Sequence, residues 1–488
     1  MTFNKLLIAN RGEIAIRIAR AASDLNINTV SMYSNDDKSS LHIRDTDETF
    51  RLDGNGVPGY LDIDNIIRIA RESGADSIHP GYGFLAENAE FAKRCQKEGI
   101  VFIGPNIETL ELFGDKGRAR LAAKDADVPI PEGLEGPVTV ESASAFFNTL
   151  PQGSGMMLKA IAGGGGRGTR SISNSSEIER LFKRCQSEAK RSFGNPDLYV
   201  EQLIENARHI EVQIIGDNFG NVTHLWEREC SIQRRYQKLV EVAPAPFITE
   251  SLRRKIIESA MNLAKSVDYS NLGTFEFLAF QSTQSEYDSF VFIEGNARLQ
   301  VEHTVTEEVT GVDIVQSQIK LAGGASLTEI GLDADKPTIV RGYAIQNRIN
   351  CETISGSGQV KPSAGKITTY IPPEGPGIRT DGFAYSGYET SMAFDSLIAK
   401  LICHSNSNSF LDAVTRSKQA LKEFEISGIE TNIEFHLKLM SHPDFLSGNI
   451  TTNFLDDNLP ELIPDCPSTN QNSVPTGKTT DRGLTHTR

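Results

Sequence analysis

The sequence has few cysteines and no long hydrophobic segment. Six cysteines are scattered along its 488 residues, at positions 95, 185, 230, 351, 403 and 466. None stands in a Cys-x-x-Cys pair, which argues against a cysteine-built metal site and favours a reduced, intracellular protein. No apolar run approaches the ~20 residues of a membrane-spanning helix. Charged residues come too early for a secretory leader, so a soluble, cytoplasmic protein without a membrane partner is predicted.

The chain lacks a positive balance of charge, because 64 acidic residues outnumber 49 basic ones and the formal net charge is −15 at pH 7. An acidic chain disfavours nucleic acid and anionic membranes as general partners, although it is compatible with a local basic cleft. One basic run, Arg234-Arg-Tyr-Gln-Lys238, stands out against this background. It predicts an anion site if metal and nucleotide ligands lie nearby, and a solvated face is the alternative.

Common nucleotide-binding signatures are missing. The turn Ala-Asn-Arg-Gly-Glu at 9–13 lacks Gly-x-Gly-x-x-Gly, so it gives no support for dinucleotide binding. The full P-loop pattern Gly-x-x-x-x-Gly-Lys-Ser/Thr and the His-Arg-Asp and Asp-Phe-Gly motifs of protein kinases are absent. The sequence has instead four consecutive glycines, 163–166, after an apolar strand predicted at 156–161. Glycine backbone N–H groups can wrap phosphate oxygens, so a flap over a nucleotide is predicted, and a surface loop is the alternative.

Lys159 supports the nucleotide interpretation. It lies within the apolar strand, between Leu158 and Ala160. Burying a lysine there is costly unless an anion receives it, and a nucleotide phosphate would be such an anion. The alternative is an exposed edge strand whose lysine head group reaches water.

Residues 290–303 are the most informative stretch, because an apolar strand there passes into alternating polar residues. Five polar side chains occupy every second position: Glu294, Asn296, Arg298, Gln300 and Glu302. In an extended chain they would line one face. Such a row suits a metal-and-anion site, and a solvated strand face is the alternative.

Glu276 favours the metal site over the solvated face. The polar stretch 281–289 predicts a hairpin loop, which would lay 274–280 antiparallel to 290–294. Glu276 would then face Glu294. Two such carboxylates can hold a hard cation such as Mg2+ through oxygen ligands.

The chain length predicts roughly two to four structural units. At the N-terminus, strands and helices alternate: strands at 5–9, 28–33, 77–79 and 101–103, helices at 12–25, 60–73 and 88–98. This pattern predicts a doubly wound parallel sheet. Further elements follow: a helix capped by Asp115, strands at 156–161, 169–172, 199–204, 209–215 and 341–350, and helices at 253–267, 409–425 and 431–441. The predicted fold is thus α/β and α+β.

The predicted division has four parts. They are an N-terminal α/β domain (1–112), a central domain (113–332) with a glycine-rich lid at about 130–203, a C-terminal mixed β/α domain (333–458), and a disordered tail or linker (459–488). The tail is predicted from its content of Pro, Ser, Thr, Asn and Gly.

Taken together, these stretches resemble the biotin carboxylases, the ATP-grasp component of biotin-dependent carboxylases. The resemblance covers residues 1 to about 458. It rests on eight motifs in order: Ile-Ala-Asn-Arg-Gly-Glu-Ile-Ala (8–15), His-Pro-Gly-Tyr-Gly-Phe-Leu (79–85), Gly-Asp-Lys (114–116), Lys-Ala-Ile-Ala-Gly-Gly-Gly-Gly-Arg-Gly (159–168), Arg-His-Ile-Glu-Val-Gln (208–213), Glu-Arg-Glu-Cys-Ser-Ile-Gln-Arg-Arg (227–235), Gly-Thr-Phe-Glu-Phe (273–277) and Arg-Leu-Gln-Val-Glu-His (298–303).

The resemblance implies a set of binding residues. ATP would be bound by Lys116, Lys159, Gly164, Gly165, Gly166, Glu201, Gln202, Leu203, Ile204, His209, Gln233, Tyr236 and Glu276, with 201–204 as the adenine hinge. Mg2+ (or Mn2+) would be held by Glu276, Glu294 and Asn296. Bicarbonate would be surrounded by Lys238, Arg298, Gln300, Val301 and Glu302. The biotin ureido ring would meet Tyr82 and Arg348.

The resemblance also implies the activity, a ligase that carboxylates biotin through carboxyphosphate in the first half-reaction of a biotin-dependent carboxylase. Glu302 would take the proton of bicarbonate. Arg298 and Lys238 would hold the anion and neutralise charge on the transferring phosphoryl group. Arg348 would stabilise the biotin enolate. Closure of the glycine flap would exclude water.

Partners follow from the same resemblance. No Met-Lys-Met segment of the kind that carries biotin is present. The expected partners are therefore a biotin carboxyl carrier protein or domain and a carboxyltransferase, with the chain itself a homodimer.

The chain departs from the family pattern at Tyr236, where the family usually has His. This position would lie near the nucleotide, and a tyrosine can still donate a hydrogen bond. In an extended chain Tyr236 would share a face with Lys238.

Two other functions remain open at this point. Another ATP-grasp carboxylate ligase would share the ATP and metal residues but would not need the 79–85 loop or Arg348. A non-catalytic partner subunit would be expected to lose Lys238, Arg298 or Glu302, and all three are present.

Overall fold

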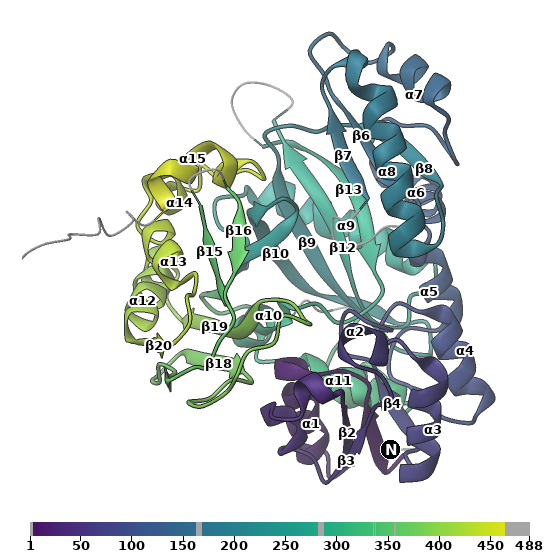
Figure 1. The fold of residues 1–488 in the computed structure, drawn as a ribbon. Helices are drawn as coiled ribbons and strands as arrows, with labels where there is room; N and C mark the ends of the chain where they lie inside the picture. Colours follow the sequence, from purple (N-terminus) through teal and green to yellow (C-terminus); the bar gives the residue numbers. More distant parts are fainter. Residues whose placement is uncertain are drawn as a thin grey trace, which may run out of the picture.

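The computed structural model describes residues 3–162, 168–281, 287–334, 336, 338–355 and 358–463. Figure 1 shows three units: the N-terminal unit at the bottom, the central unit at the upper right and the C-terminal unit at the left. The predicted glycine flap, including Gly164, Gly165 and Gly166, lies outside the described residues, as does 464–488 of the predicted tail. Within the described ranges, no helix is long and apolar enough to cross a membrane.

The N-terminal unit is the predicted parallel sheet covered by helices on both faces. Its strands, in the spatial order β3-β2-β1-β4-β5, are β1 (Lys5–Ile8), β2 (Asn28–Tyr33), β3 (Glu48–Arg51), β4 (Ser77–His79) and β5 (Val101–Phe102). Its helices are α1 (Gly12–Asp24), α2 (Gly56–Gly59), α3 (Ile63–Ser73) and α4 (Ala89–Lys97). Leu6 of β1 packs in the cluster that contains α1, and Leu7 in the cluster that contains α3 and α4, as alternation along a strand requires.

The central unit contains a small separate sheet that we call the lid. Its antiparallel strands are β6 (Met156–Ala160), β7 (Thr169–Ile172) and β8 (Leu198–Gln202), and its helices are α7 (Val140–Phe147) and α8 (Ile178–Phe193). Helices α5 (Ile107–Gly114) and α6 (Lys116–Asp125) lead into it. Asp115 caps α6 as predicted, because its side chain accepts hydrogen bonds from the backbone N–H groups of Gly117 and Arg118.

An eight-stranded antiparallel sheet joins the central and C-terminal units, in the order β13-β12-β9-β10-β11-β14-β19-β18. Its central strands are β9 (Arg208–Gly216), β10 (Val222–Arg234), β11 (Gln237–Ala243), β12 (Asn271–Phe280) and β13 (Ser289–Asn296). Its C-terminal strands are β14 (Tyr343–Asn350), β18 (Ile378–Gly382) and β19 (Leu397–Ser405). Because β11 pairs with β14, the boundary predicted at 332/333 does not interrupt the sheet.

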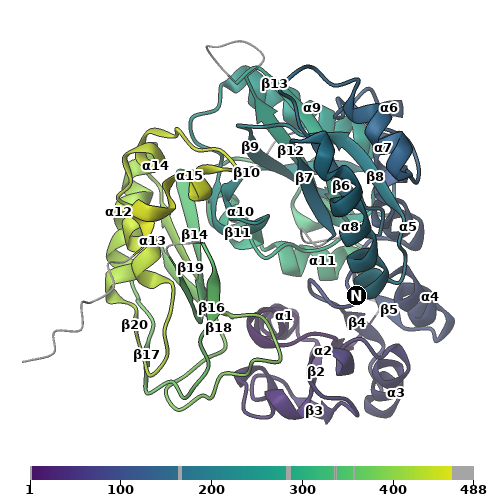
Figure 2. The same cartoon turned by 45° about the horizontal axis from the view of Figure 1, so that its top comes forward.

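The remaining elements cover this sheet, as Figure 2 shows for the C-terminal helices beside β14 and β19. The helices are α9 (Glu250–Ser266), α10 (His303–Thr310), α11 (Ile314–Ala322), α12 (Phe410–Glu423), α13 (Ile433–Leu439), α14 (Pro443–Ser447) and α15 (Phe454–Leu462). The short strands are β15 (Glu352–Ile354), β16 (Val360–Pro362), β17 (Thr369–Ile371) and β20 (Glu425–Ser427).

The prediction of a hairpin is confirmed, but the prediction that the chain stays extended from Asn296 to Glu302 is wrong. Strands β12 and β13 pair antiparallel with Glu276 opposite Glu294. Strand β13 ends at Asn296, where the N–H of Arg298 donates to the carbonyl of Asn296 at 2.9 Å. Leu299 is fully buried in the apolar cluster where β1 and α1 of the N-terminal unit meet α11, and this draws the chain away from the sheet. Glu302 then directly precedes α10.

The predicted tail also begins too early. Residues 459–462 belong to α15, and Leu459 and Leu462 are buried in the apolar cluster of the C-terminal unit. Their burial explains why the helix extends into a stretch that composition assigned to a tail.

Candidate active site

A cleft of about 450 Å3 lies between the lid, the eight-stranded sheet and the N-terminal unit. The predicted site residues that line it are Tyr82, Lys116, Lys159, His209, Gln233, Tyr236, Lys238, Glu276, Glu294, Asn296, Arg298, Gln300, Val301, Glu302 and Arg348. They come from all three units, so the fold brings together residues that are far apart in the sequence.

Lys238 of β11 is at the centre of the charged groups. Its Nζ lies 3.0 Å from Glu276 Oε1 and 2.7 Å from Glu302 Oε1, and it also contacts the carboxylate of Glu211. Burial acts to lower the pKa of Lys238, but the attraction of Glu211, Glu276 and Glu302 outweighs it and holds the pKa well above its usual value. The side chain is therefore a fixed ammonium ion at neutral pH.

Glu302 is ionised for the matching reason. Burial acts to raise its pKa, but Lys238, Arg348 and Arg228 hold the pKa well below its usual value. Arg348 Nη2 donates to Glu302 Oε2 at 3.1 Å, and Arg348 Nε donates to Glu241 Oε1 at 2.6 Å. Two cations thus flank one buried carboxylate.

Arg298 and Gln300 form a second polar group at this end of the cleft. Arg298 donates to Gln300 Oε1 at 2.9 Å, to Asn296 Oδ1 at 3.0 Å and to Glu87 Oε2 at 2.9 Å. Gln300 Nε2 is buried without a hydrogen-bond partner among the described residues. An unpaired buried donor beside a guanidinium is suited to a small anion.

The two carboxylates of the hairpin lie among basic and amide groups, and Glu276 is also one of the contacts of Lys238. Glu276 Oε2 lies 2.7 Å from His209 Nε2, Glu276 Oε1 accepts from Asn296 Nδ2 at 2.8 Å, and Glu294 contacts Lys116. Burial acts to raise the pKa of both carboxylates, but Lys238 and His209 hold that of Glu276 below its usual value, and Lys116 that of Glu294. Two ionised oxygen ligands on paired strands fit a hard divalent cation.

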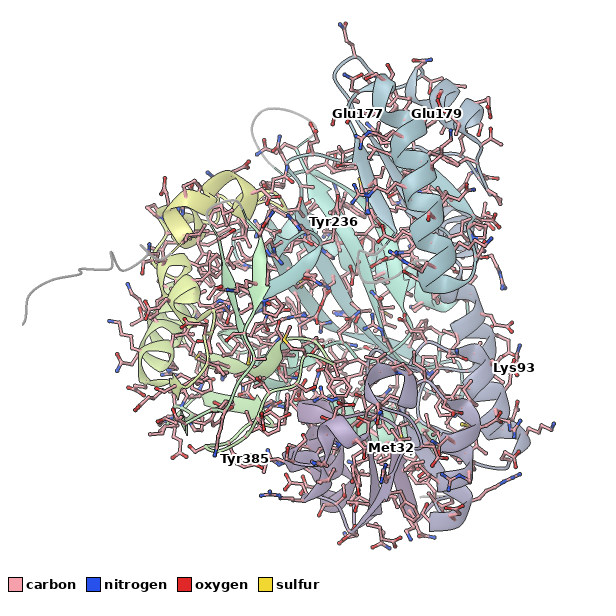
Figure 3. All side chains as sticks on the ribbon, viewed as in Figure 1. Met32, Lys93, Glu177, Glu179, Tyr236 and Tyr385 are labelled. Carbon is pink, nitrogen blue, oxygen red and sulfur yellow. The ribbon has the colours of Figure 1, made fainter. Side chains whose placement is uncertain are left out.

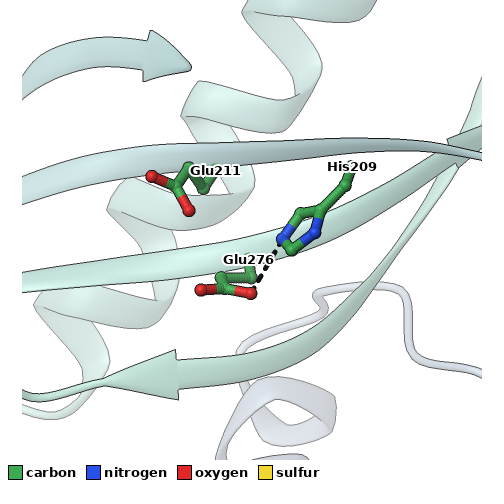
Figure 4. A group of neighbouring side chains, drawn as sticks. All are labelled: His209, Glu211 and Glu276. Carbon is green, nitrogen blue, oxygen red and sulfur yellow. Dashed lines mark ion pairs between the residues drawn. The ribbon is translucent and has the colours of Figure 1, made fainter. Parts of the chain in front are cut away.

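Glu211 was missed by sequence reasoning as a member of this site. Figure 4 shows it beside the ion pair of His209 and Glu276, and it lies on β9, the same strand as His209. Its carboxylate contacts the buried Arg228 as well as Lys238, so we interpret it as a counter-ion rather than a metal ligand. The alternation of β9, which puts 209 and 211 on one face, was the signal that could have identified it. Glu241, which accepts a hydrogen bond from Arg348, was also missed, and no pattern in the sequence around it indicated that it belongs to the site.

The predicted adenine hinge does not reach the lining of the cleft. Glu201 of β8 is buried and contacts Arg120 at 2.8 Å and Lys159, so an internal carboxylate receives the lysine that the sequence assigned to a phosphate. The backbone N–H group of Gln202 donates to the carbonyl of Glu132, and that of Leu203 donates to the carbonyl of Gly155. Ile204, the last residue of the predicted hinge, does not line the cleft either. Met157 and Thr169 line the cleft from the lid side instead.

Three family models match the chain. They are described as the biotin carboxylase N-terminal domain (residues 2–110), the ATP-binding domain of the carbamoyl-phosphate synthase L chain (115–330) and the biotin carboxylase C-terminal domain (346–457). Biotin carboxylase 1 of Bacillus subtilis is 45% identical over 454 residues, which cover 93% of this chain and 98% of that protein. Pyruvate carboxylase of Staphylococcus aureus is 47% identical over 470 residues, covering 95% of this chain and 40% of that protein. The chain thus spans about two fifths of the pyruvate carboxylases.

Solved structures agree with this similarity. The biotin carboxylase domain dimer of 2-oxoglutarate carboxylase from Hydrogenobacter thermophilus, in complex with MgADP, ADP and bicarbonate, has a TM-score of 0.89 at 41% identity and covers 95% of this chain and 100% of that chain. A biotin carboxylase complex with β,γ-ATP from Campylobacter jejuni has a TM-score of 0.87 at 41% identity, with 93% of this chain and 99% of that chain covered.

Proposed function

The chain belongs to the biotin carboxylases, which are ATP-dependent ligases, and we propose that its cleft carboxylates biotin with ATP and bicarbonate. One observation carries the assignment of residues. A carboxylate pair suited to a divalent cation and a cluster of cations around a buried carboxylate base share one cleft.

The nucleotide and metal belong at the end formed by the hairpin and the lid. Glu276, Glu294 and Asn296 would hold Mg2+ (or Mn2+), which supplies charge neutralisation for phosphate oxygens. Lys116 and Lys159 also line the cleft, where Lys116 contacts Glu294 and Lys159 contacts Glu201, and His209 and Gln233 line it as well. Glu201, Gln202, Leu203, Ile204 and the glycines at 164–166 belong to this proposal through the family resemblance.

Bicarbonate belongs next to these metal ligands, in the part of the cleft around Lys238, whose Nζ also contacts Glu276. Lys238 and Arg298 supply fixed positive charge, and Gln300 Nε2 and the backbone of Val301 complete the wall. Glu302, ionised and buried between Lys238 and Arg348, is the proposed base for the bicarbonate proton. Bicarbonate would then attack the γ-phosphoryl group of ATP, with ADP as the leaving group, to give carboxyphosphate. Carboxyphosphate would release CO2 and phosphate, and the phosphate would take the proton from the biotin nitrogen that receives CO2.

The biotin ring belongs beside Tyr82 and Arg348. Both line the cleft, and the Tyr82 hydroxyl donates to Glu13. Burial first, and then the neighbouring Glu13, raise the pKa of Tyr82 well above its usual value, so the phenol stays neutral. Arg348 is the proposed partner of the biotin enolate, because its charge is held in place by Glu241 and Glu302.

We also propose the wider setting of the reaction. The domains would divide at about 112/113 and 332/333, close to the limits of the three family models, and the C-terminal domain would extend through α15. Biotin would be attached to a carrier protein or domain, and the carboxylated biotin would then be used by a carboxyltransferase, as the similarity to longer pyruvate carboxylases suggests. A homodimer and a cytoplasmic location complete the proposal; every cysteine in the described ranges is buried and free of a disulfide.

Bicarbonate-dependent ATP hydrolysis, measured with and without free biotin, tests the function. A biotin carboxylase needs bicarbonate for turnover and responds to biotin. Another ATP-grasp carboxylate ligase would ignore biotin, and a non-catalytic partner subunit would show no turnover at all. Either result would overturn the proposal.

The metal assignment predicts a changed Mg2+ requirement. Glu276→Gln and Glu294→Gln each replace a charged oxygen ligand of a shared ion. Each should raise the Mg2+ concentration for half-maximal activity by about tenfold or more, since even groups that support metal ligands cost about 10–100-fold in affinity when removed. Glu48→Gln, at an ion pair with Lys5 in the N-terminal sheet, is the control. A Mg2+ titration that is the same for all three variants would contradict the assignment.

Tyr236 occupies a position that differs from the extended geometry predicted for it. It lies with Arg235 in the two-residue turn between β10 and β11, and both residues have positive φ (48° and 67°) because such tight hairpins require it. Its side chain still lines the cleft, 46% exposed, with Oη 4.0 Å from Met157 Sδ of the lid. Figure 3 places it where the central sheet meets the lid.

Tyr236→His should therefore tighten ATP binding. Burial raises the pKa of the Tyr236 phenol, so it carries no charge, whereas a histidine with an ordinary pKa gains a proton below about pH 6.5. A charged donor beside phosphates is worth about 1 kcal/mol, or roughly a fivefold lower Michaelis constant for ATP, most visible below pH 7. The Michaelis constant for bicarbonate should not move. Tyr236→Phe controls for loss of the phenol, and equal ATP constants from pH 6 to 8 would show that the residue does not touch the nucleotide.

A further inference from the structure

Lys400 of β19 is a fully buried lysine outside the residues assigned so far. Its side chain is 0% exposed, and its Nζ lies 3.0 Å from Glu13 Oε2 of α1. The same Nζ donates to the backbone carbonyl of Val301 at 3.2 Å. Glu13 in turn accepts the hydroxyl of Tyr82. One buried ion pair therefore contacts both the 298–302 loop and the Tyr82 loop.

The sheet register explains how Lys400 reaches this position. On β14 and β19, Arg348 and Lys400 are directly paired, so their side chains leave the same face of the sheet. Arg348 Nη2 binds the side chain of Glu302, and Lys400 Nζ binds the carbonyl of Val301. Two neighbouring cations thus hold two successive residues of one loop.

Stability does not explain this ion pair. Moving two charges out of water is costly, and replacing a buried pair by uncharged groups of similar size is often neutral or stabilising. Asp381, the partner of Lys400 on β18, lies 3.9 Å from Lys400 Nζ but is held more closely by Arg379, at 2.9 and 2.8 Å. The contacts that depend on Lys400 are those to Glu13 and Val301.

We propose that Lys400, together with Glu13, is a positioning residue that holds the Val301 carbonyl and Tyr82 in fixed relation to each other. This inference rests on the proposed function, in which the first loop binds bicarbonate and the second meets biotin. Lys400 touches neither substrate. Its role is to keep the two loops in the geometry that carboxyl transfer requires.

The test is the double variant Lys400→Met with Glu13→Gln. It removes both charges together, so no carboxylate is left buried without a partner, and the glutamine can still accept the Tyr82 hydroxyl. We expect a roughly tenfold to hundredfold loss of biotin-stimulated turnover and a raised Michaelis constant for bicarbonate, because small misplacements carry costs of this size. The Michaelis constant for ATP should stay within about twofold, since the nucleotide end of the cleft is not in contact with the pair.

Two further measurements separate positioning from a general loss of structure. Hydrogen exchange without substrates should become faster at 80–85 and 298–302 in the double variant and stay unchanged in the lid. Lys5→Met is the matched control, because Lys5 pairs with Glu48 and with the Ser73 carbonyl at 2.6 Å in the N-terminal sheet; its kinetics should equal those of the wild type.

Three outcomes would distinguish the positioning role of Lys400 from a structural role and from failure of the proposed function. Wild-type bicarbonate constants and biotin response in a folded double variant would overturn the inference. So would a lower unfolding temperature with every Michaelis constant unchanged, which indicates a structural role. Faster exchange in the two loops of a protein whose wild type shows no bicarbonate-dependent ATP hydrolysis would support the positioning role while overturning the proposed function.

Discussion

A Lys238→Met variant is expected to lose about 10²–10³ of the bicarbonate-dependent rate of ATP hydrolysis, the usual cost of removing one pre-placed electrostatic group. It should also be less stable than the wild type. The Nζ of Lys238 lies among the buried carboxylates of Glu211, Glu276 and Glu302, and removing it leaves them facing one another. Breaking such a buried pair typically costs about 3–5 kcal/mol, which urea unfolding at pH 7 would measure.

Acid should narrow this stability difference. In the wild type, the lowered pKa values of Glu276 and Glu302 contribute stability above their unfolded pKa, and that contribution is lost as the pH falls through the folded values. In Lys238→Met the largest of the charges that lower them is gone, so both pKa values rise relative to the wild type and protonation relieves the repulsion. Unfolding free energies that kept a constant gap from pH 7 to pH 4 would show that Lys238 does not hold these carboxylates ionised.

Arg298→Ala is the matched comparison. Arg298 is 16% exposed and its carboxylate partner Glu87 is 39% exposed, so its loss leaves no deeply buried acid without a partner. The variant should lose turnover on a scale similar to Lys238→Met, about 10²–10³, yet unfold at nearly the wild-type urea concentration. Near-normal bicarbonate-dependent turnover in Arg298→Ala would refute the bicarbonate assignment.

The parts of the site that sequence could predict are the local ones. Glu276 and Glu294 face each other because a short polar loop joins their strands, and a hairpin fixes its own register. The cap of α6 by Asp115 was predictable for the same reason, since a side chain and the next turn of backbone decide it.

The parts that sequence pattern could not predict depend on contacts between distant segments. Lys238 and Arg348 lie on either side of Glu302 because β11 pairs with β14, which comes more than a hundred residues later in the chain. Family resemblance, and not the sequence pattern, indicated that these two residues share a site. The alternation after Asn296 predicted a strand, but burial of Leu299 where the N-terminal unit meets α11 overrode it. Nor could pattern show that Glu201 pairs with Lys159, because the two are joined across β6 and β8 of the lid.

The network around Glu302 sets a condition on its proposed role as a base. Its carboxylate is held by Lys238 and Arg348, which lower its pKa and make it a weak proton acceptor. Bicarbonate beside Lys238 would compete for the same ammonium group. As that bond is shared, the pKa of Glu302 rises toward the range in which it can accept a proton. In this proposal, Glu302 becomes able to accept a proton only when bicarbonate is bound beside Lys238.

Glu302→Gln should consequently lose about 10²–10⁴ of the bicarbonate-dependent rate, the range that general bases contribute, with the Michaelis constant for ATP unchanged. The amide keeps the size of the side chain and can still bind Arg348, while Glu211 and Glu276 continue to hold Lys238, so urea unfolding should detect little change. Glu302→Asp retains a carboxylate at a longer reach and should recover part of the rate that the amide cannot. If the glutamine variant kept more than about a tenth of the wild-type rate, or if the aspartate variant were no faster than it, proton removal would have to be assigned to another group.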